Sequence, residues 1–382
     1  MLYGWWHASN IIIHGLHLVT NIVLYFYSLS KSGGAERRIC QLANELEKKK
    51  YKVFLCSLDE PGTSSYYPLA EGVTWWQLGR KKNGLYDKVS RIVRLYLALR
   101  KNKVNILIGF VMSGDKTIFL SAKFARIRLI VAERNSPKMY WIRLSFIQRW
   151  VVFAFMHLAD RITIQMPEFI SQYPRSLHKR LITIPNPVPQ AKNLSNPSIP
   201  NQEDRFILLA VSRLDNLQKR IDLLVRSFHI IADDFRQWNL QIIGSGEDRE
   251  QLRKLITEKE LDQRIQLIEA KKNILKYYEH AHLFVIPSRW EGFPNALAEA
   301  MSHGLPAVGF AESSGVAELI GHGGWLAEGN SSVESLAEAL RKAMSNPEER
   351  RQKGETGKTF VQSFTPEKHI NQWDKLIKLL LS

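Results

Sequence analysis

Two glutamates, Glu291 and Glu299, stand eight positions apart in a stretch that could recognise a phosphorylated sugar. The apolar run 282–287 predicts a strand before them, and 295–302 predicts a helix after a Gly-Phe-Pro corner. Glu291 would then lie in the loop at the carboxyl end of the strand, where open α/β sheets bind ligands. The start of the helix offers N–H groups and partial positive charge to a phosphate. The spacing alone fits such a site and an ordinary strand–loop–helix joint about equally well.

Two cations further upstream, Arg213 and Lys219, could hold a diphosphate. They follow a predicted strand over 206–211. Arginine offers a planar fork of donors and lysine a point charge, and both suit phosphate oxygens. Positive charge there would also stabilise the negative charge that develops on a departing nucleoside diphosphate. A solvated basic turn is the competing interpretation, which the accompanying glutamates weaken.

Glycine turns follow predicted strands at two places in the chain. Gly33 and Gly34 come after the run 21–27, and Gly244 comes after 239–243. Glycine lets the backbone approach a phosphate closely at such a turn. Many glycine turns serve only the geometry of the chain, so these residues support a phosphate site without establishing one.

Strands and helices alternate along the chain in two successive series, which predicts two doubly wound α/β domains facing each other. We predict a first domain over 21–188 and a second over 204–365. The proline-rich segment 189–203 reads as the linker between them. The amphipathic segment 366–382 predicts a helix that braces one domain against the other. Residues 1–20 would be an appended segment of uncertain role.

The first thirty residues contain no Lys, Arg, Asp or Glu, so a membrane-spanning helix is one interpretation. His7, His14 and His17 would be costly inside a bilayer, and the stretch lacks the cationic start of a secretory signal. We therefore expect the buried strand over 21–27 instead. Two cysteines, Cys40 and Cys56, exclude a disulfide framework and a thiolate metal cluster, which favours a reducing cytoplasm.

The net charge of +16 is concentrated in the first half of the chain. Residues 1–190 carry 28 Lys and Arg against 11 Asp and Glu, whereas residues 191–382 carry 25 against 26. This asymmetry predicts an anionic partner, either membrane headgroups or nucleic acid. The segment 139–158 combines six aromatic residues with Arg143 and Arg149, which suits a helix on lipid headgroups and equally a core helix with two snorkelling arginines. No recognised nucleic-acid motif accompanies the charge, so we expect a membrane surface.

Several motifs together resemble the retaining glycosyltransferases of the GT-B fold, specifically family four. The resemblance extends from about residue 21 to the end of the chain. The most specific motif is PSRWEGFPNALAEAMSHGLPAV over 287–308, and the others are SGGAER (32–37), VSRL (211–214), IIGSGED (242–248) and SSGVAELI (313–320).

The resemblance implies a role for each matching residue. Arg213 and Lys219 would bind the donor diphosphate, Glu291 would contact the transferred sugar, and Glu299 would hold the ribose hydroxyls. The donor site would further include Gly33, Gly34, Gly244, Gly292, Phe293 and Pro294. It also implies retention of anomeric configuration, with no metal or other cofactor, since the sugar nucleotide is the substrate.

The first domain departs from the family pattern. No histidine follows the strand at 104–110, whereas many members carry one there. Glu133, Arg134 and Asn135 follow the next strand instead, as in members that transfer galactose or N-acetylhexosamine type sugars. We predict these three residues and Glu36 on the acceptor side.

The sequence therefore predicts a retaining, metal-independent enzyme that moves a hexose or N-acetylhexosamine from a nucleoside-diphosphate sugar, with UDP favoured. The acceptor would be a glycan or polyprenyl-linked saccharide in surface polysaccharide or lipopolysaccharide assembly, at the cytoplasmic face of an anionic membrane. The alternatives are a catalytically silent sugar-nucleotide-binding subunit and a GT-B-fold sugar-nucleotide epimerase.

Overall fold

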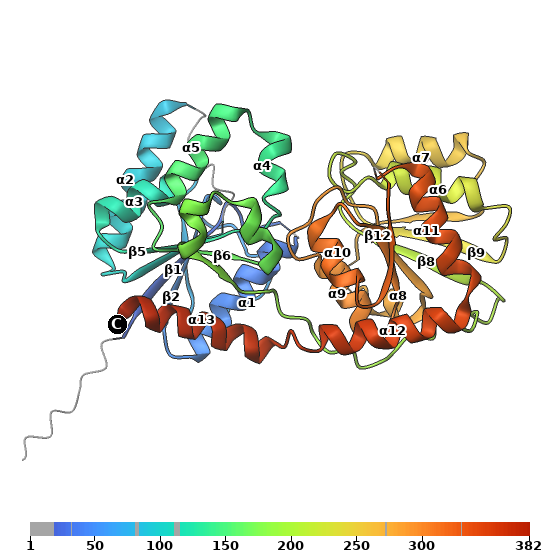
Figure 1. Ribbon diagram of the computed structural model, residues 1–382. Coiled ribbons are helices and arrows are strands. Elements are labelled where there is room, and N and C mark those ends of the chain that lie inside the picture. The colour runs from blue at the N-terminus through green and yellow to red at the C-terminus, as the bar shows by residue number, and fades with distance from the viewer. Residues whose placement is uncertain (1–18, 32, 81–83, 111–114, 272, 330) are drawn as a thin grey trace, which may run out of the picture.

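The computed structural model describes residues 19–31, 33–80, 84–110, 115–271, 273–329 and 331–382. These residues form two α/β domains, each built on a parallel sheet, which lie side by side in Figure 1. The predicted fold class, two doubly wound α/β domains, is confirmed. Apart from residues 19 and 20, the predicted appended segment 1–20 lies outside the described residues. In the part of the chain that is described, no helix is long and apolar enough to cross a membrane.

The first domain contains a seven-stranded sheet among the described residues, in the order β3-β2-β1-β4-β5-β6-β7. Every neighbouring pair is parallel, and the order reverses between β1 and β4. The strands are β1 (Asn21–Tyr25), β2 (Lys52–Ser57), β3 (Thr74–Gln77), β4 (Ile106–Gly109), β5 (Arg128–Ala132), β6 (Arg161–Ile164) and β7 (Leu181–Thr183).

Helices cover both faces of this sheet. The helix α1 buries Ile39, Leu42, Ala43 and Leu46, whose spacing places them on one stripe. One face packs against α1 (Gly34–Lys48) and α13 (Pro366–Leu381), and the other against α2 (Leu85–Lys101), α3 (Lys116–Ala125) and α5 (Phe146–Met156). Shorter pieces are α4 (Lys138–Arg143) and the 3₁₀ segments η1 (Pro167–Gln172) and η2 (Arg175–Arg180).

The second domain repeats this plan with six described parallel strands in the order β10-β9-β8-β11-β12-β13. Its strands are β8 (Phe206–Val211), β9 (Trp238–Ile243), β10 (Ile265–Ile268), β11 (Leu283–Ile286), β12 (Ala307–Phe310) and β13 (Gly324–Ala327). Its helices are α6 (Ile221–Ile231), α7 (Arg249–Glu258), α8 (Leu275–His280), α9 (Asn295–Ser302), α10 (Ser314–Ile320), α11 (Val333–Ser345) and α12 (Pro347–Val361).

The chain crosses between the domains twice. Residues 189–203, predicted as the linker, lie along the second domain, where buried Arg350 donates to the Pro197 carbonyl at 2.9 Å. After α12 the chain returns, and α13 places Trp373 in the core of the first domain, 6.1 Å from the ring of Phe110. The two crossings meet where the Val188 N–H donates to the Phe364 carbonyl at 2.7 Å.

The aromatic segment 139–158 forms two helices rather than one. The break falls at Leu144 and Ser145, and the Ser145 hydroxyl caps α5 in a capping box with Gln148. Neither β3 nor α12 was expected from the sequence.

Candidate active site

The predicted donor residues meet at the topological switch point of the second sheet. β8 and β11 are hydrogen-bonded neighbours in the middle of that sheet, and the strand order runs outward from them in opposite directions. The loops that leave the carboxyl ends of two such strands separate and leave a crevice between them. Arg213 and Lys219 lie in the loop after β8. Glu291 lies in the loop after β11, and Glu299 lies in α9, which follows that loop. The switch point therefore brings the two pairs to the same edge of the sheet.

Lys219 and Glu291 form an ion pair inside this arrangement. Lys219 Nζ lies 2.5 Å from Glu291 Oε1, and the Ser288 hydroxyl donates to the same oxygen at 2.7 Å. The Glu291 residue is only 7% exposed, and the Lys219 side chain 15%. The charges of both side chains are thus held at fixed positions with little water around them.

Gln218 joins the loop after β8 to the loop after β11. Its Nε2 donates to the Trp290 carbonyl at 3.1 Å, and its own carbonyl accepts from the Arg289 N–H at 2.8 Å. Its Oε1 accepts from Arg213 Nη2 at 3.3 Å. Gln218 therefore fixes the position of Arg213 relative to the segment that carries Glu291, a role not expected from the sequence.

Glu299 is held by the first domain. Its carboxylate is paired with Arg37 of α1, with Arg38 Nη2 at 3.9 Å, and it accepts from the Tyr278 hydroxyl at 3.5 Å. Burial acts to lower the pKa of Arg37, but the charge of Glu299 outweighs it, so the pKa is raised above its usual value. This ion pair joins residues 262 positions apart across the boundary between the domains.

A second polar contact crosses the boundary beside the first. Asn295, the first residue of α9, accepts from Arg38 Nη2 at 3.1 Å and from Asn186 Nδ2 at 3.0 Å. Asn186 in turn accepts from Arg134 at 3.1 Å. The side chain of Asn295 thus holds the start of α9 against the first domain.

The first-domain loop lies directly opposite. A Cβ added to Gly34 would meet the Asn295 amide at 3.3 Å, so this loop approaches α9 closely. Gly33 adopts an extended backbone, and a Cβ added there would meet the side chain of Glu36. Burial raises the pKa of Glu36, while the charge of Arg213 across the boundary opposes this rise. Glu36 therefore belongs to the electrostatic environment of the donor residues.

The Gly-Phe-Pro corner also packs against the first domain. A Cβ on Gly292 would come within 2.5 Å of the Arg134 carbonyl, and the Phe293 N–H donates to Gln165 Oε1 at 3.0 Å. Phe293 is buried, and Pro294 stands just before α9. These contacts fix the corner between Glu291 and Glu299 at the domain boundary.

Gly244 has a structural reason to be glycine. A Cβ there would lie 1.9 Å from the Ser212 carbonyl, so the turn after β9 requires glycine to pack against the turn after β8. This turn lies beside the loop that carries Arg213, and the structure by itself gives Gly244 a packing function.

The predicted acceptor residues after β5 are differently placed. Glu133 is only 3% exposed and accepts from the Tyr140 hydroxyl inside the first domain. Burial raises its pKa to about 7, against hydrogen bonds from Tyr140 and Tyr173 that act to lower it. Arg134 stacks over the Phe110 ring with its guanidinium carbon 4.2 Å from the centroid. Glu133 therefore lies in the interior of the first domain, whereas Arg134 reaches the boundary through its contact with Asn186. Asn135 follows it and is partly buried.

The described residues contain no group of three or more His, Cys, Asp and Glu that could hold a metal ion. What the boundary does contain is a mixed set of fixed charges, in which two carboxylates are each paired with a cation. Carboxylates accept from sugar hydroxyls, and the arginine and lysine side chains bind phosphate oxygens. The boundary thus holds both kinds of side chain, carboxylates and cations, at fixed positions.

Sequence reasoning did not identify Gln218, Arg38, Asn295 or Tyr278 as members of the site. Arg37 belongs to the SGGAER motif, but nothing local to that motif indicates Glu299 as its partner. Arg38 directly follows Arg37, and Asn295 begins the predicted helix. The sequence therefore shows both residues beside predicted site residues, but it does not show that Arg38 and Asn295 contact each other.

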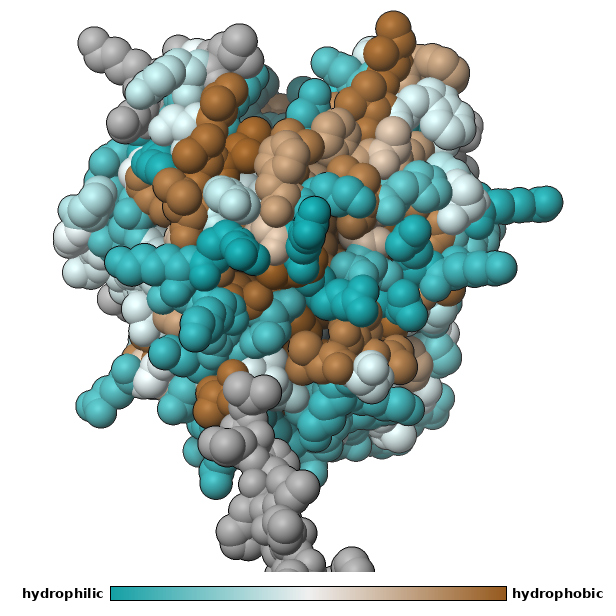
Figure 2. Space-filling view, turned by 90° about the vertical axis from the view of Figure 1, so that its left-hand side faces the viewer, coloured by the Kyte–Doolittle hydropathy of each residue, from teal (hydrophilic) through white to brown (hydrophobic). Residues whose placement is uncertain are grey.

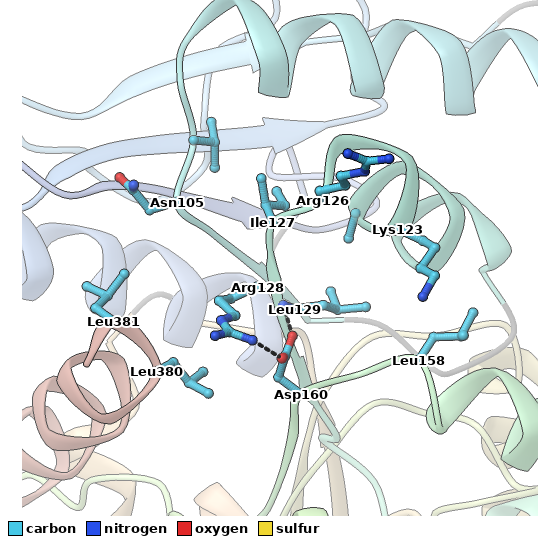
Figure 3. Close-up of a pocket in the computed structure, with 12 residues that line it drawn as sticks. Asn105, Lys123, Arg126, Ile127, Arg128, Leu129, Leu158, Asp160, Leu380 and Leu381 are labelled. Carbon is cyan, nitrogen blue, oxygen red and sulfur yellow. Dashed lines mark hydrogen bonds and ion pairs between the residues drawn. The ribbon is translucent and has the colours of Figure 1, made fainter.

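A cavity of about 690 Å³ lies elsewhere, at the amino ends of β4 and β5 in the first domain. Figure 3 shows Asp160 among the residues that line it, where it accepts from Arg128 at 3.1 Å and from the Leu129 N–H at 2.8 Å. Lys123, Arg126 and the last leucines of α13 also line the cavity. Because the candidate site faces the carboxyl ends of the strands, this cavity is not part of it.

Comparisons with known proteins give a consistent result. Residues 192–379 match the family model described as glycosyl transferases group 1. An uncharacterized glycosyltransferase of Haemophilus influenzae is 25% identical over 370 residues, covering 93% of this chain and 99% of that protein. An amylovoran biosynthesis glycosyltransferase of Erwinia amylovora is 24% identical, again over 93% and 99%. The solved structure of a sucrose-phosphate synthase from Thermosynechococcus elongatus has a similar fold, with a TM-score of 0.78, 18% identity, and coverage of 95% and 99%.

Proposed function

We propose that this protein, which belongs to the group 1 glycosyltransferases of the GT-B fold, transfers a hexose or N-acetylhexosamine from a nucleoside-diphosphate sugar, with UDP as nucleotide. The acceptor is a glycan or a lipid-linked saccharide in surface polysaccharide assembly. The similarity to an amylovoran biosynthesis enzyme supports the polysaccharide class. The observation that carries the proposal is the meeting of Lys219, Arg213, Glu291 and Glu299 at one switch point.

In the proposed complex the diphosphate lies against Arg213 and Lys219. Lys219 already has a fixed position because Glu291 holds it, so little reorganisation is needed when the phosphate charge develops. Glu291 contacts the transferred sugar, and its charge supports an oxocarbenium-like centre. The acceptor hydroxyl attacks from the face that the diphosphate leaves, which retains the anomeric configuration, and the leaving phosphate takes the hydroxyl proton. No metal takes part in the proposed reaction.

Ribose binding at Glu299 requires an exchange of partners. Its carboxylate is engaged by Arg37 in this structure. We propose that the two ribose hydroxyls donate to Glu299 and take over part of this contact. Arg37 would then be released from Glu299. Donor binding would in this way be linked to the contact between the domains.

We also propose that the protein works at the cytoplasmic face of a membrane. The excess of 17 positive charges in residues 1–190 supports attraction to anionic headgroups. Each basic residue near such a surface contributes about 1 kcal/mol. A lipid-linked acceptor would be available at that surface.

The test is a panel of UDP-, GDP- and ADP-sugars offered with glycan and polyprenyl-linked acceptors, with release of nucleotide as the readout. Glu291→Gln and Arg213→Ala should each reduce transfer by at least about a hundredfold, the order expected for removal of a charge-stabilising group. Arg341→Ala, an exposed change on α11 of the same domain, is the matched control and should leave turnover unchanged.

Two other outcomes would replace the proposal. Isomerisation of a sugar nucleotide without any acceptor would identify an epimerase. Binding of UDP without turnover on any acceptor would identify a silent sugar-nucleotide-binding subunit. Normal turnover in Glu291→Gln would remove the role given to that residue.

A further inference from the structure

We propose that α4 and α5 form a membrane-inserting surface that brings the lipid end of the acceptor to the domain boundary. This inference deepens the proposed function and rests on its lipid-linked acceptor. The occupant of the surface is an anionic phospholipid bilayer. The surface is defined by six exposed apolar side chains, which are Trp141, Ile142, Phe146, Ile147, Trp150 and Val151.

The exposed side of α5 is apolar, although a helix on a protein surface normally turns polar residues outward. Ile147 is 74% exposed, Phe146 67% and Trp150 50%. The opposite side of the same helix packs Val152, Phe153 and Met156 into the core. Apolar residues on the buried side are explained by packing, but those on the outer side require another partner.

Helix α2, which packs against α3, repeats this pattern. Its exposed residues Tyr86, Val89, Val93 and Leu97 recur at three- and four-residue intervals, which places them on one outward stripe. Twelve of the 21 large apolar residues exposed in the described part of the chain lie between residues 84 and 160. This concentration distinguishes a patch from the scattered exposed apolar residues of an ordinary surface. Figure 2, which views the side of the molecule where α2 and α3 lie, shows brown apolar groups gathered among hydrophilic ones.

The charge around the patch selects an anionic bilayer as the occupant. The segment 84–160 contains 14 Lys and Arg but only four acidic residues, which are Asp87, Asp115, Glu133 and Asp160. The first three are buried, and Asp160 is partly buried and paired with Arg128. Exposed cations therefore stand among apolar and aromatic side chains with no fully exposed carboxylate between them. Basic residues interleaved with Trp, Phe and Ile are the composition of helices that lie in the headgroup region of anionic membranes.

The surface is continuous with the candidate active site. Arg143, the last residue of α4, lies over the ring of Trp290 with its guanidinium carbon 5.3 Å from the centroid. Trp290 directly precedes Glu291 in the chain. At its start, α4 contacts the second domain again, since Lys138 donates to the Glu312 carbonyl at 2.8 Å. A lipid next to α4 would therefore have its headgroup end within reach of the boundary between the domains.

The far end of α5 leads to a basic hollow. Leu158, two residues beyond α5, lines the 690 Å³ cavity described above, together with Lys123, Arg126 and Arg128 (Figure 3). Asp160 neutralises one of these three cations. A bilayer lying along α5 would thus place its phosphates beside positive charge at both ends of the helix.

The experiment measures where the protein touches lipid. Full-length protein is mixed with vesicles of equal parts phosphatidylcholine and phosphatidylglycerol whose acyl chains carry bromine, which quenches tryptophan fluorescence only by contact. We expect strong quenching of the wild type and much weaker quenching of the double variant Trp141→Phe/Trp150→Phe. The matched control is Trp325→Phe in the second domain, which should be quenched like the wild type. Equal quenching in the double variant would overturn the assignment of α4 and α5.

Binding itself is measured by sedimentation with the same lipids without bromine. Ile147→Ser/Trp150→Ser should lower the partition coefficient of the protein between water and vesicles about tenfold, because exposed apolar area drives interfacial insertion. Ile230→Ser/Leu275→Ser removes similarly exposed apolar groups from the second domain and should change nothing. Pure phosphatidylcholine vesicles should bind the wild type much less. Equal binding to both vesicle types would overturn the anionic selection.

Two readouts separate this inference from the proposed function. UDP should raise the melting temperature of the wild type and of Ile147→Ser/Trp150→Ser equally, because the variant leaves the donor site intact. Absence of any UDP effect with normal vesicle binding would count against the proposed function alone. Sedimentation velocity without vesicles should show a monomer, and a dimer that Ile147→Ser/Trp150→Ser dissociates would show that the patch is a subunit interface and overturn the inference.

Discussion

The ion pair between Lys219 and Glu291 should be coupled strongly enough to measure in the unliganded protein. Lys219→Met keeps the length and apolar part of the side chain but removes the charge. Glu291→Gln keeps the shape of the acid and still allows Ser288 to donate to its oxygen. The double variant replaces the charged pair with two neutral groups of similar volume.

The expected magnitude follows from burial. Removing one partner of a fully buried ion pair costs about 3–5 kcal/mol, because the other charge is left unpaired. Lys219 retains 15% exposure, so water reaches it in part and the cost falls toward the lower limit. We therefore expect Lys219→Met to lower the free energy of unfolding by about 3 kcal/mol. A hydrogen bond to a charged group contributes about 1.5–3 kcal/mol, so the coupling energy of the pair should be about 2 kcal/mol.

The assay is urea denaturation of the wild type, both single variants and the double variant, followed by circular dichroism at constant pH and salt. The double variant should be more stable than the sum of the single effects predicts, by the coupling energy. Neighbouring groups deviate from additivity in this way, whereas independent sites add within about 0.5 kcal/mol. Additive effects would refute the view that Lys219 is held in place by Glu291 before the donor arrives.

Three further changes test other parts of the structure. Because folding raises the pKa of Glu133 to about 7, its protonated form is favoured in the folded state, so the stability it contributes is present below pH 4.5 and is lost as pH rises toward 7. Glu133→Gln should therefore be more stable than the wild type at pH 8, by at most about 3 kcal/mol, and should lose this advantage at pH 4.5, as pH-dependent urea melts would show. Gly292→Ala places a Cβ 2.5 Å from the Arg134 carbonyl and should separate the domains, which would lower kcat at least about tenfold. Gly84→Ala has open space around its Cβ and should leave kcat unchanged. Equal kcat values for the two variants would contradict the close approach at Gly292. Trp373→Ala should destabilise the first domain by about 3–5 kcal/mol in thermal or urea melts, since the side chain is fully buried, and a loss below about 1 kcal/mol would show that α13 does not belong to that core.

Local patterns in the sequence predicted most of the strands and helices but failed where packing does not follow apolar periodicity. α12 (Pro347–Val361) is rich in charge and was not expected to be a helix. It packs through Gly354, where a Cβ would lie 2.0 Å from the Gly304 carbonyl, and through Arg350, which is 1% exposed and donates to main-chain carbonyls. Close backbone approach and a buried arginine leave no apolar stripe to recognise.

The candidate site also contains residues that local patterns identified and residues that they placed wrongly. Arg213 and Glu291 were identifiable because each closely follows the end of a strand, and strand ends are local features. Lys219 and Glu299 were identifiable because they stand at short, fixed spacings from those two residues. Glu133 also follows a strand end, and the resemblance to one branch of the family placed it on the acceptor side, yet it lies in the interior against Tyr140. Position after a strand indicates an edge of the sheet but not whether the side chain turns toward solvent or core.

The sequence by itself determined the two-domain α/β architecture and the residue types at the switch point of the second sheet. It did so because periodicity, glycine turns and the eight-residue spacing of the two glutamates depend only on neighbouring residues. Only the tertiary structure decided the partners of those residues, such as Arg37 for Glu299 across 262 positions and Gln218 for the Trp290 carbonyl. Such pairs depend on which surfaces the whole chain brings together, and no local pattern records that choice.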